Sequence, residues 1–163
     1  KILERNSRPG DPEIINLLPI LKDDFVEVCL KIIEGRLRGI EFEKMASVVT
    51  YKVPMTYGGY KSEYAGDNLI DLTKAEGLEE AHGGRFRVYP ASVELRGDRC
   101  YALGSRAVAV FGAGESIQLA RDLSLEGITA VKGPLWNRSD IASEGHLGNS
   151  IRHMEALRKG VGT

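Results

Sequence analysis

The chain has 163 residues, of which 42 % are hydrophobic, and its 22 Lys and Arg residues balance 23 Asp and Glu residues. The net charge of −1 excludes the polybasic surface that attracts nucleic acid or anionic lipid, and the apolar runs are far shorter than the ~20 residues of a membrane span. We therefore expect a globular protein without nucleic-acid or membrane partners, and a cytoplasmic location because Cys29 and Cys100 lie in apolar segments typical of reduced thiols.

The first seven residues, KILERNS, alternate in the manner of a β-strand. Because side chains two positions apart on a strand point the same way, Glu4 and Asn6 are expected side by side on one face. The alternation stops at the turn RPGDPE, where Asp11 is expected to cap a helix that begins at Pro12. The start of the chain therefore predicts a strand, a tight turn and a helix.

The helix after this turn carries apolar residues at spacings of three and four, which define one helical face. These residues are Ile14, Leu18, Leu21, Phe25, Val28 and Ile32. Because a proline inside a helix removes a backbone hydrogen bond, we expect Pro19 to kink or divide the helix. Gly35 is expected to end it, since glycine readily adopts the left-handed conformation of a helix terminus.

The rest of the chain is rich in β-branched residues and turn signals, which favour a small unit of antiparallel strands. In chain order we expect a strand at 46–54, a Gly- and Tyr-rich loop at 56–68, two strands around a turn at 96–98, a strand at 105–112, and helices at 115–125 and 149–159. Gly127 is expected to close the first of these helices. The predicted fold class is α+β, with a strand and helix followed by a mainly antiparallel C-terminal domain.

Glu4 and Asn6 are the residues best suited to hold a metal ion. A carboxylate and an amide oxygen suit a magnesium ion that bridges phosphates, because such an ion takes only one or two protein ligands. Arg8 would join them if the strand continued that far. The alternative is an edge strand whose polar face meets solvent, because E-x-N is too short to be diagnostic. The turn that follows favours the metal site, since free N–H groups at a helix start attract anions.

The stretch LERNSRPGDPEIINLLPILKDDFVEVCLKIIEGRL resembles the end of the ATP-grasp domain of glycinamide ribonucleotide synthetase, also called phosphoribosylamine–glycine ligase. The similarity continues in ASVVTYKVPMTYGGY, LGSRAVAVFGAGESIQLARDLS and NRSDIA, and spans Ile2 to Ala142. It implies that residues 1–38 end an ATP-grasp domain and that residues 39–163 form the synthetase's C-terminal domain. We interpret the chain as the carboxyl-terminal part of a longer enzyme, so that the missing amino-terminal part is an expected partner.

Several positions depart from the commonest form of the family. Arg5 stands between the two metal ligands, where an apolar or aromatic residue is usual. Ser105 replaces the second glycine of a Gly-Gly-Arg segment, and Ala142 replaces the last glycine of the closing motif. These changes leave Glu4 and Asn6 intact. We interpret them as signs of a divergent, archaeal branch.

The resemblance also implies roles for individual residues. We expect metal ligation by Glu4 and Asn6, a catalytic role for Arg8 and Asp11, and substrate binding by Gly10, Arg106 and Arg138. Arginine suits phosphate or carboxylate recognition because its paired N–H donors match two oxygens. The alternative for both arginines is a surface ion pair with a neighbouring acid, which for Arg138 would be Asp140.

The reaction implied by the resemblance joins glycine to 5-phosphoribosylamine in purine biosynthesis, with ATP as a substrate and Mg²⁺ or Mn²⁺ as the cofactor. Glycine would form a glycyl phosphate, and the sugar amine would then displace phosphate. This chain alone is expected to be inactive. Two alternatives stay open: a non-catalytic binding module that complements a separate amino-terminal half, and a different ATP-grasp carboxylate–amine ligase.

Overall fold

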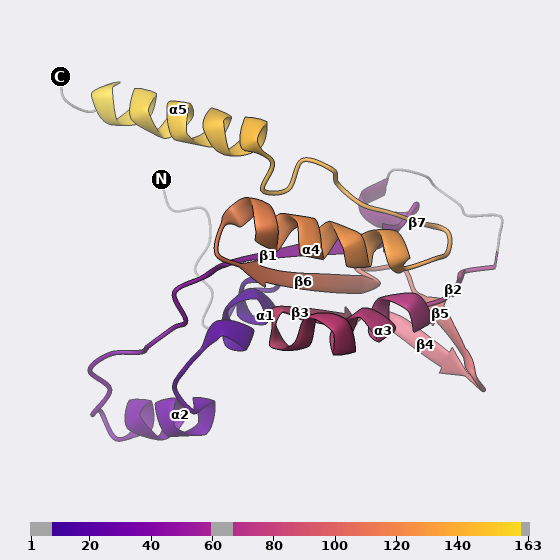
Figure 1. Cartoon of the computed structure of the whole chain (residues 1–163), viewed down its shortest axis with the longest axis horizontal. Helices are drawn as coiled ribbons and strands as arrows, with labels where there is room; N and C mark the ends of the chain where they lie inside the picture. Colours follow the sequence, from indigo (N-terminus) through magenta and orange to yellow (C-terminus); the bar gives the residue numbers. More distant parts are fainter. Residues whose placement is uncertain (1–7, 60–66, 161–163) are drawn as a thin grey trace.

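The computed structural model describes residues 8–59 and 67–160, so the predicted strand with Glu4 and Asn6 and part of the Gly- and Tyr-rich loop lie outside the described residues (Figure 1). The helices are α1 (Glu13–Leu17), α2 (Phe25–Ile33), α3 (Thr73–His82), α4 (Ile117–Ala130), α5 (Glu144–Gly160) and 3-10 helices at Leu18–Ile20, Tyr57–Gly59 and Gly83–Arg85. The strands are β1 (Ala46–Pro54), β2 (Leu69–Ile70), β3 (Phe86–Pro90), β4 (Val93–Arg96), β5 (Arg99–Ala102), β6 (Val108–Gly114) and β7 (Leu135–Trp136). Within the described ranges, none of the helices has the length and apolarity needed to cross a bilayer.

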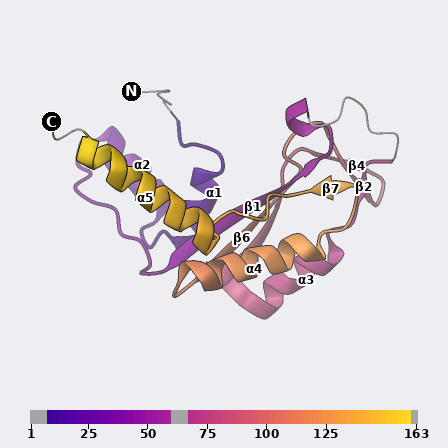
Figure 2. The ribbon, with the colours of Figure 1, turned by 90° about the horizontal axis from the view of Figure 1, so that it is seen from above.

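The strands form two sheets, one with the order β3-β6-β1-β7 and one with the order β2-β5-β4. All strand pairs in the described residues are antiparallel. Helices α3 and α4 lie together on one side of the larger sheet, and α1 lies on the other side (Figure 2). The predicted α+β class with mainly antiparallel strands is therefore confirmed.

Strand β6 lies at the centre of the larger sheet, and all seven of its residues are buried. On one face, Val108 and Val110 pack with Phe86 and Ile128, and on the other Phe111 packs with Ile20. The glycines of the sequence FGAGES allow α4 to approach, because a Cβ on Gly112 would meet the backbone of α4 at Ala120. The core therefore needs small residues at the end of β6.

The amino-terminal helices agree in part with the sequence-based expectation. Pro19 divides the predicted helix into α1, a 3-10 helix and α2, and Gly35 follows α2 with a φ of +65°. The predicted cap is wrong, because Pro12 occupies the N-cap position of α1 and Asp11 stands one residue before it. The carboxylate of Asp11 instead accepts a hydrogen bond from Tyr51, which is 40 positions away in the chain.

Four further parts of the chain differ from the sequence-based expectation. Helix α3 was not predicted, because Ala75 is its one buried residue and the helix carries no clear apolar face. The segment predicted to form two strands forms three, since β3 ends at Pro90 and joins the larger sheet. Gly127 does not end a helix, because α4 continues to Ala130. Helix α5 also begins earlier than predicted, at Glu144 instead of Asn149.

Gly127→Ala is expected to destabilise the fold by about 1–3 kcal/mol, measured by urea unfolding. The new methyl group would lie 2.5 Å from the ring of Phe86 and 2.6 Å from Val110, in a core that has no room for it. Gly77→Ala in α3 is the matched control, because no atom beyond its chain neighbours and the adjacent helix backbone lies within 4 Å of the added Cβ. This control is expected to raise stability by about 0.5–1 kcal/mol through helix propensity. Equal destabilisation by both variants would contradict the packing argument.

Candidate functional site

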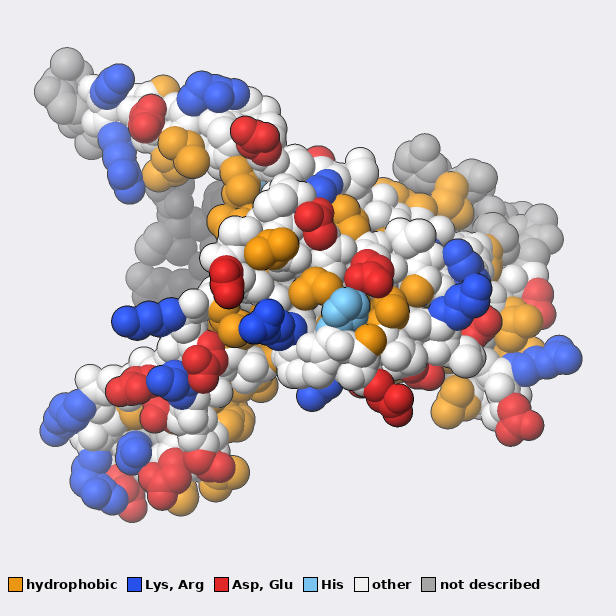
Figure 3. All heavy atoms as spheres, in the orientation of Figure 1, with side chains coloured by type: hydrophobic (Ala, Val, Ile, Leu, Met, Phe, Trp, Pro, Cys, Tyr) orange, Lys and Arg blue, Asp and Glu red, His pale blue; other side chains and the backbone are white. Residues whose placement is uncertain are grey.

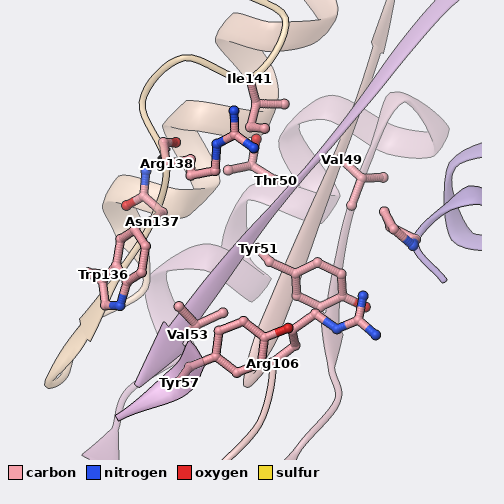
Figure 4. Close-up of a pocket in the computed structure, with 11 residues that line it drawn as sticks. Val49, Thr50, Tyr51, Val53, Tyr57, Arg106, Trp136, Asn137, Arg138 and Ile141 are labelled. Atoms are coloured by element: carbon pink, nitrogen blue, oxygen red, sulfur yellow. Dashed lines mark hydrogen bonds between the residues drawn. The ribbon is translucent and has the colours of Figure 1, made fainter. Parts of the chain in front are cut away.

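A cavity of about 200 Å³ lies along β1 and contains both arginines predicted to bind substrate, Arg106 and Arg138 (Figure 4). Its lining comes from β1, the 3-10 helix that follows β1, the segment before β6, β7, the segment after β7, and the turn before α1. The lining residues are Pro12, Val49, Thr50, Tyr51, Val53, Tyr57, Arg106, Trp136, Asn137, Arg138 and Ile141. The fold therefore joins residues from the two ends of the chain around one cavity.

Arg106 contacts the turn that precedes α1. Its Nη1 donates a hydrogen bond to the carbonyl oxygen of Asp11 at 2.9 Å, and its Nη2 lies 3.1 Å from Oδ2 of the same residue. The hydroxyl group of Tyr51 donates to the other carboxylate oxygen at 2.7 Å. The guanidinium carbon of Arg106 also lies 5.2 Å from the centre of the Tyr51 ring, within the range of a cation–π contact. Arg106, Tyr51 and Asp11 thus form a three-residue junction, named here the Asp11 junction.

The phenol of Tyr51 stays protonated over the whole physiological pH range and so remains a hydrogen-bond donor to Asp11. Burial raises its pKa above the ordinary value, and the hydrogen bond to Asp11 raises it further. Tyr51 was not predicted as a site residue. Its place on β1 follows from the alternation in ASVVTYKVP, which puts Val49, Tyr51 and Val53 on the same face. The alternation predicts which face of β1 carries Tyr51, but it does not predict that Tyr51 contacts Asp11.

Arg138 lies in the same cavity but is held by a neighbouring acid. Its Nε and Nη2 donate to the two carboxylate oxygens of Asp140 at 2.9 and 2.6 Å. Both side chains are about half exposed. The ion pair that the sequence left open as an alternative is therefore present. The guanidinium keeps further N–H donors, because this pair uses two of its five.

The hydrogen bonds from Arg138 lower the pKa of Asp140 to about 2 from a reference value of 3.8. A depressed carboxyl pKa means that the pair contributes stability above about pH 4 and loses it as the pH falls through 2. A carbon-detected NMR titration is expected to give a midpoint near pH 2 for Asp140. In Arg138→Ala the midpoint should move up toward 3.8. An unchanged midpoint in that variant would show that Arg138 is not the cause.

The other predicted site residues lie in the turn before α1. Gly10 accepts a hydrogen bond from Ile14 N through its carbonyl oxygen, and Arg8 is exposed with its Nη1 bonded to the carbonyl of Pro9 at 2.8 Å. In residues 8–59 and 67–160 there is no cluster of three or more His, Cys, Asp or Glu side chains that could hold a metal ion. The predicted ligands, Glu4 and Asn6, lie outside these ranges.

Comparison with known proteins identifies archaeal relatives of the chain. It is 39 % identical over 160 residues to the phosphoribosylamine–glycine ligase of Methanocella arvoryzae, 37 % over 158 residues to that of Thermococcus kodakarensis, and 33 % over 158 residues to that of Methanobrevibacter smithii. These matches cover 96–97 % of the chain but 34 % of each relative, so the chain spans about a third of the relatives' length. No protein-family model matches the chain. The chain is homologous to the carboxyl-terminal third of these ligases.

Proposed function

We propose that this chain is the carboxyl-terminal part of an ATP-dependent ligase that joins glycine to 5-phosphoribosylamine in purine biosynthesis. The observation that carries the proposal is the homology over nearly the whole chain to archaeal phosphoribosylamine–glycine ligases. The longer protein that contains this chain is called the full-length ligase below. Its cytoplasmic location belongs to the same proposal.

In this proposal residues 1–38 end an ATP-grasp domain and residues 39–163 form the C-terminal domain. The Asp11 junction supports a role for both domains in one site. It binds the turn before α1, in residues 1–38, to Tyr51 on β1 and to Arg106, which both belong to residues 39–163. A shift of the turn relative to the cavity would break charge-assisted hydrogen bonds. The junction would therefore keep the phosphate end of the nucleotide site aligned with the cavity along β1.

The surface of α2 also supports the proposal that a larger protein surrounds this chain. Helix α2 stands apart from the sheets and carries hydrophobic side chains on its surface (Figures 1 and 3). Large apolar side chains of α2 with exposed fractions from 48 % to 80 % are Phe25, Val26, Leu30, Ile32 and Ile33. Contiguous apolar patches on a protein surface mark contact sites. In our proposal the rest of the ligase covers this helix.

The proposed reaction has two steps. The carboxylate of glycine attacks the γ-phosphate of ATP and releases ADP, and the amine of phosphoribosylamine then attacks the carbonyl carbon of the glycyl phosphate and releases phosphate. Glu4 and Asn6 would hold the Mg²⁺ or Mn²⁺ ion, which neutralises charge on the nucleotide phosphates when it is bound. Such chemistry depends mainly on positioning and charge neutralisation.

The described residues would contribute binding and orientation to these steps. Arg106 and Arg138 place two guanidinium groups in the cavity for the phosphate of the sugar. Asp11 was predicted to be catalytic, but both of its carboxylate oxygens are engaged, so we propose that it orients Arg106. Arg8 and Gly10 would shape the phosphate end of the site, since the turn leads into the start of α1.

The isolated 163-residue chain is expected to make no detectable glycinamide ribonucleotide from ATP, glycine and phosphoribosylamine, because it spans a third of the relatives' length. The full-length ligase is expected to catalyse the reaction. Both are measured by ADP release and by mass spectrometry of the product. Turnover by the isolated chain would contradict our assignment of catalysis to the longer protein. A full-length ligase that rejects glycine and accepts another carboxylate would overturn the proposed substrate.

A further inference from the structure

Strand β1 has one paired edge and one largely open edge. Along the first edge, residues 46–52 pair with β6. Along the second edge, β7 pairs with Val53 and Pro54 only, and the chain then turns away after Trp136. The cavity that contains Arg106 and Arg138 lies along this second edge. Among residues 8–59 and 67–160, a stretch of β1 thus borders the cavity without a neighbouring strand.

The direction of the backbone groups on β1 follows from one backbone hydrogen bond and the geometry of a strand. The carbonyl oxygen of Lys52 accepts a hydrogen bond from Ala107 N at 3.0 Å, on the β6 side. Because successive residues of a strand present their N–H and C=O groups to opposite edges, Thr50 also faces β6. The N–H and C=O groups of Val49 and Tyr51 therefore face the open edge and the cavity.

These groups of Val49 and Tyr51 have no backbone partner among the residues that the structure describes. The strand β3 illustrates how such a group is normally satisfied. The N–H of Val88 faces away from β6 and donates to the carboxylate of Glu79 at 2.7 Å. Exposed strand edges of this kind bind extended ligands through main-chain hydrogen bonds.

The gap opposite this edge is held open by side chains of the same molecule. Arg121 on α4 donates to the carbonyl oxygens of Ser139 and Ile141 at 2.8 and 3.0 Å. Arg138 is fixed by its pair with Asp140. In the part of the chain that the structure describes, the side-chain hydrogen bonds of the segment after β7 therefore run to α4 and within the segment itself. The space between this segment and β1 is preformed for a ligand (Figure 4).

We propose that this edge of β1 binds the glycyl group of glycinamide ribonucleotide, the product of the proposed ligation, as a single residue of an added strand. The glycyl amino group donates to the carbonyl oxygen of Val49, and the glycyl carbonyl accepts from the N–H of Tyr51. Both groups flank Thr50 and face the same cavity. A glycyl unit fits this pattern because the nitrogen and carbonyl of one extended residue point in the same direction.

This subsite deepens the proposed function and rests on it. The phosphate of the product then lies within the cavity that Arg106 and Arg138 share. Ribose 5-phosphate has the same anionic group but lacks the glycyl unit, so it is the matched control ligand. It is expected to occupy the cavity without engaging the N–H of Tyr51.

The test is hydrogen exchange of backbone amides in the full-length ligase labelled with ¹⁵N-tyrosine. At a product concentration about 100 times Kd, exchange at Tyr51 is expected to slow by up to ~100-fold, because exchange then requires release of the product. Ribose 5-phosphate is expected to leave exchange at Tyr51 unchanged. Calorimetry with the same ligands shows whether each one binds.

Each other outcome overturns the inference. Product binding with unchanged exchange at Tyr51 would exclude the edge subsite and leave the proposed function standing. Equal slowing by ribose 5-phosphate would mean that Tyr51 responds to general closure of the cavity, not to the glycyl group. A full-length ligase that does not bind glycinamide ribonucleotide at all would overturn both the subsite and the proposed function.

Discussion

Glu4→Ala in the full-length ligase is expected to lower kcat about 100- to 1,000-fold. The glutamate is proposed to ligate an ion that neutralises charge on the transferred phosphate, and loss of one such stabilising contact costs roughly 2.7–4 kcal/mol at a transition state. Steady-state kinetics at several Mg²⁺ concentrations measures the effect. The concentration of Mg²⁺ that gives half-maximal rate should also rise, since a metal ligand has been removed.

Leu3→Ala is the matched control for this prediction, because Leu3 is the neighbour expected on the opposite face of the same strand. If that face packs into the core, the variant loses about 2–5 kcal/mol of unfolding free energy, while the folded fraction keeps its Mg²⁺ dependence. Thermal and urea unfolding separate the two effects. Equal losses of kcat in the two variants with unchanged folding would contradict the assignment of Glu4 to the metal.

Arg106→Ala is expected to raise the KM for phosphoribosylamine about 10- to 100-fold and to leave the KM values for ATP and glycine nearly unchanged. A charge-assisted hydrogen bond to the sugar phosphate contributes about 1.5–3 kcal/mol, which corresponds to this change in affinity. The variant also leaves Asp11 with Tyr51 as its remaining partner in the junction. Steady-state kinetics with each substrate varied in turn measures the three constants.

Tyr51→Phe separates the two roles that Arg106 has in this structure. The variant removes the hydrogen bond to Asp11 and keeps the aromatic ring beside the guanidinium. Its increase in the KM for phosphoribosylamine is expected to stay below about tenfold, because Arg106 keeps its own bonds to Asp11. If Arg106→Ala instead raised all three KM values equally, Arg106 would serve the fold and not the sugar phosphate.

Short sequence patterns were sufficient to predict those helices and strands whose own residues indicate their structure. The β-branched run at 46–54 predicts β1 with its observed bounds, and the proline at position 19 divides the first helix as expected. Asp11 was expected to cap that helix, whereas its carboxylate is engaged by Tyr51 and Arg106. A side chain that suits a cap can form stronger charge-assisted bonds elsewhere when the fold brings a cation to it.

The sequence by itself determined the α+β class, the central strands and the resemblance to a ligase family, because each depends on residues close together in the chain. Only the tertiary structure decided where Gly127 lies and how the site is assembled. Glycine at position 127 predicts a helix end by local propensity, but α4 continues to Ala130. Glycine is required at this position because Phe86 packs where a Cβ would be. Likewise, Asp11 and Arg106 are 95 positions apart. No local sequence pattern predicts that the pairing of β1 with β6 brings them together. Contacts of this range arise from packing of the whole core, which short sequence patterns do not encode.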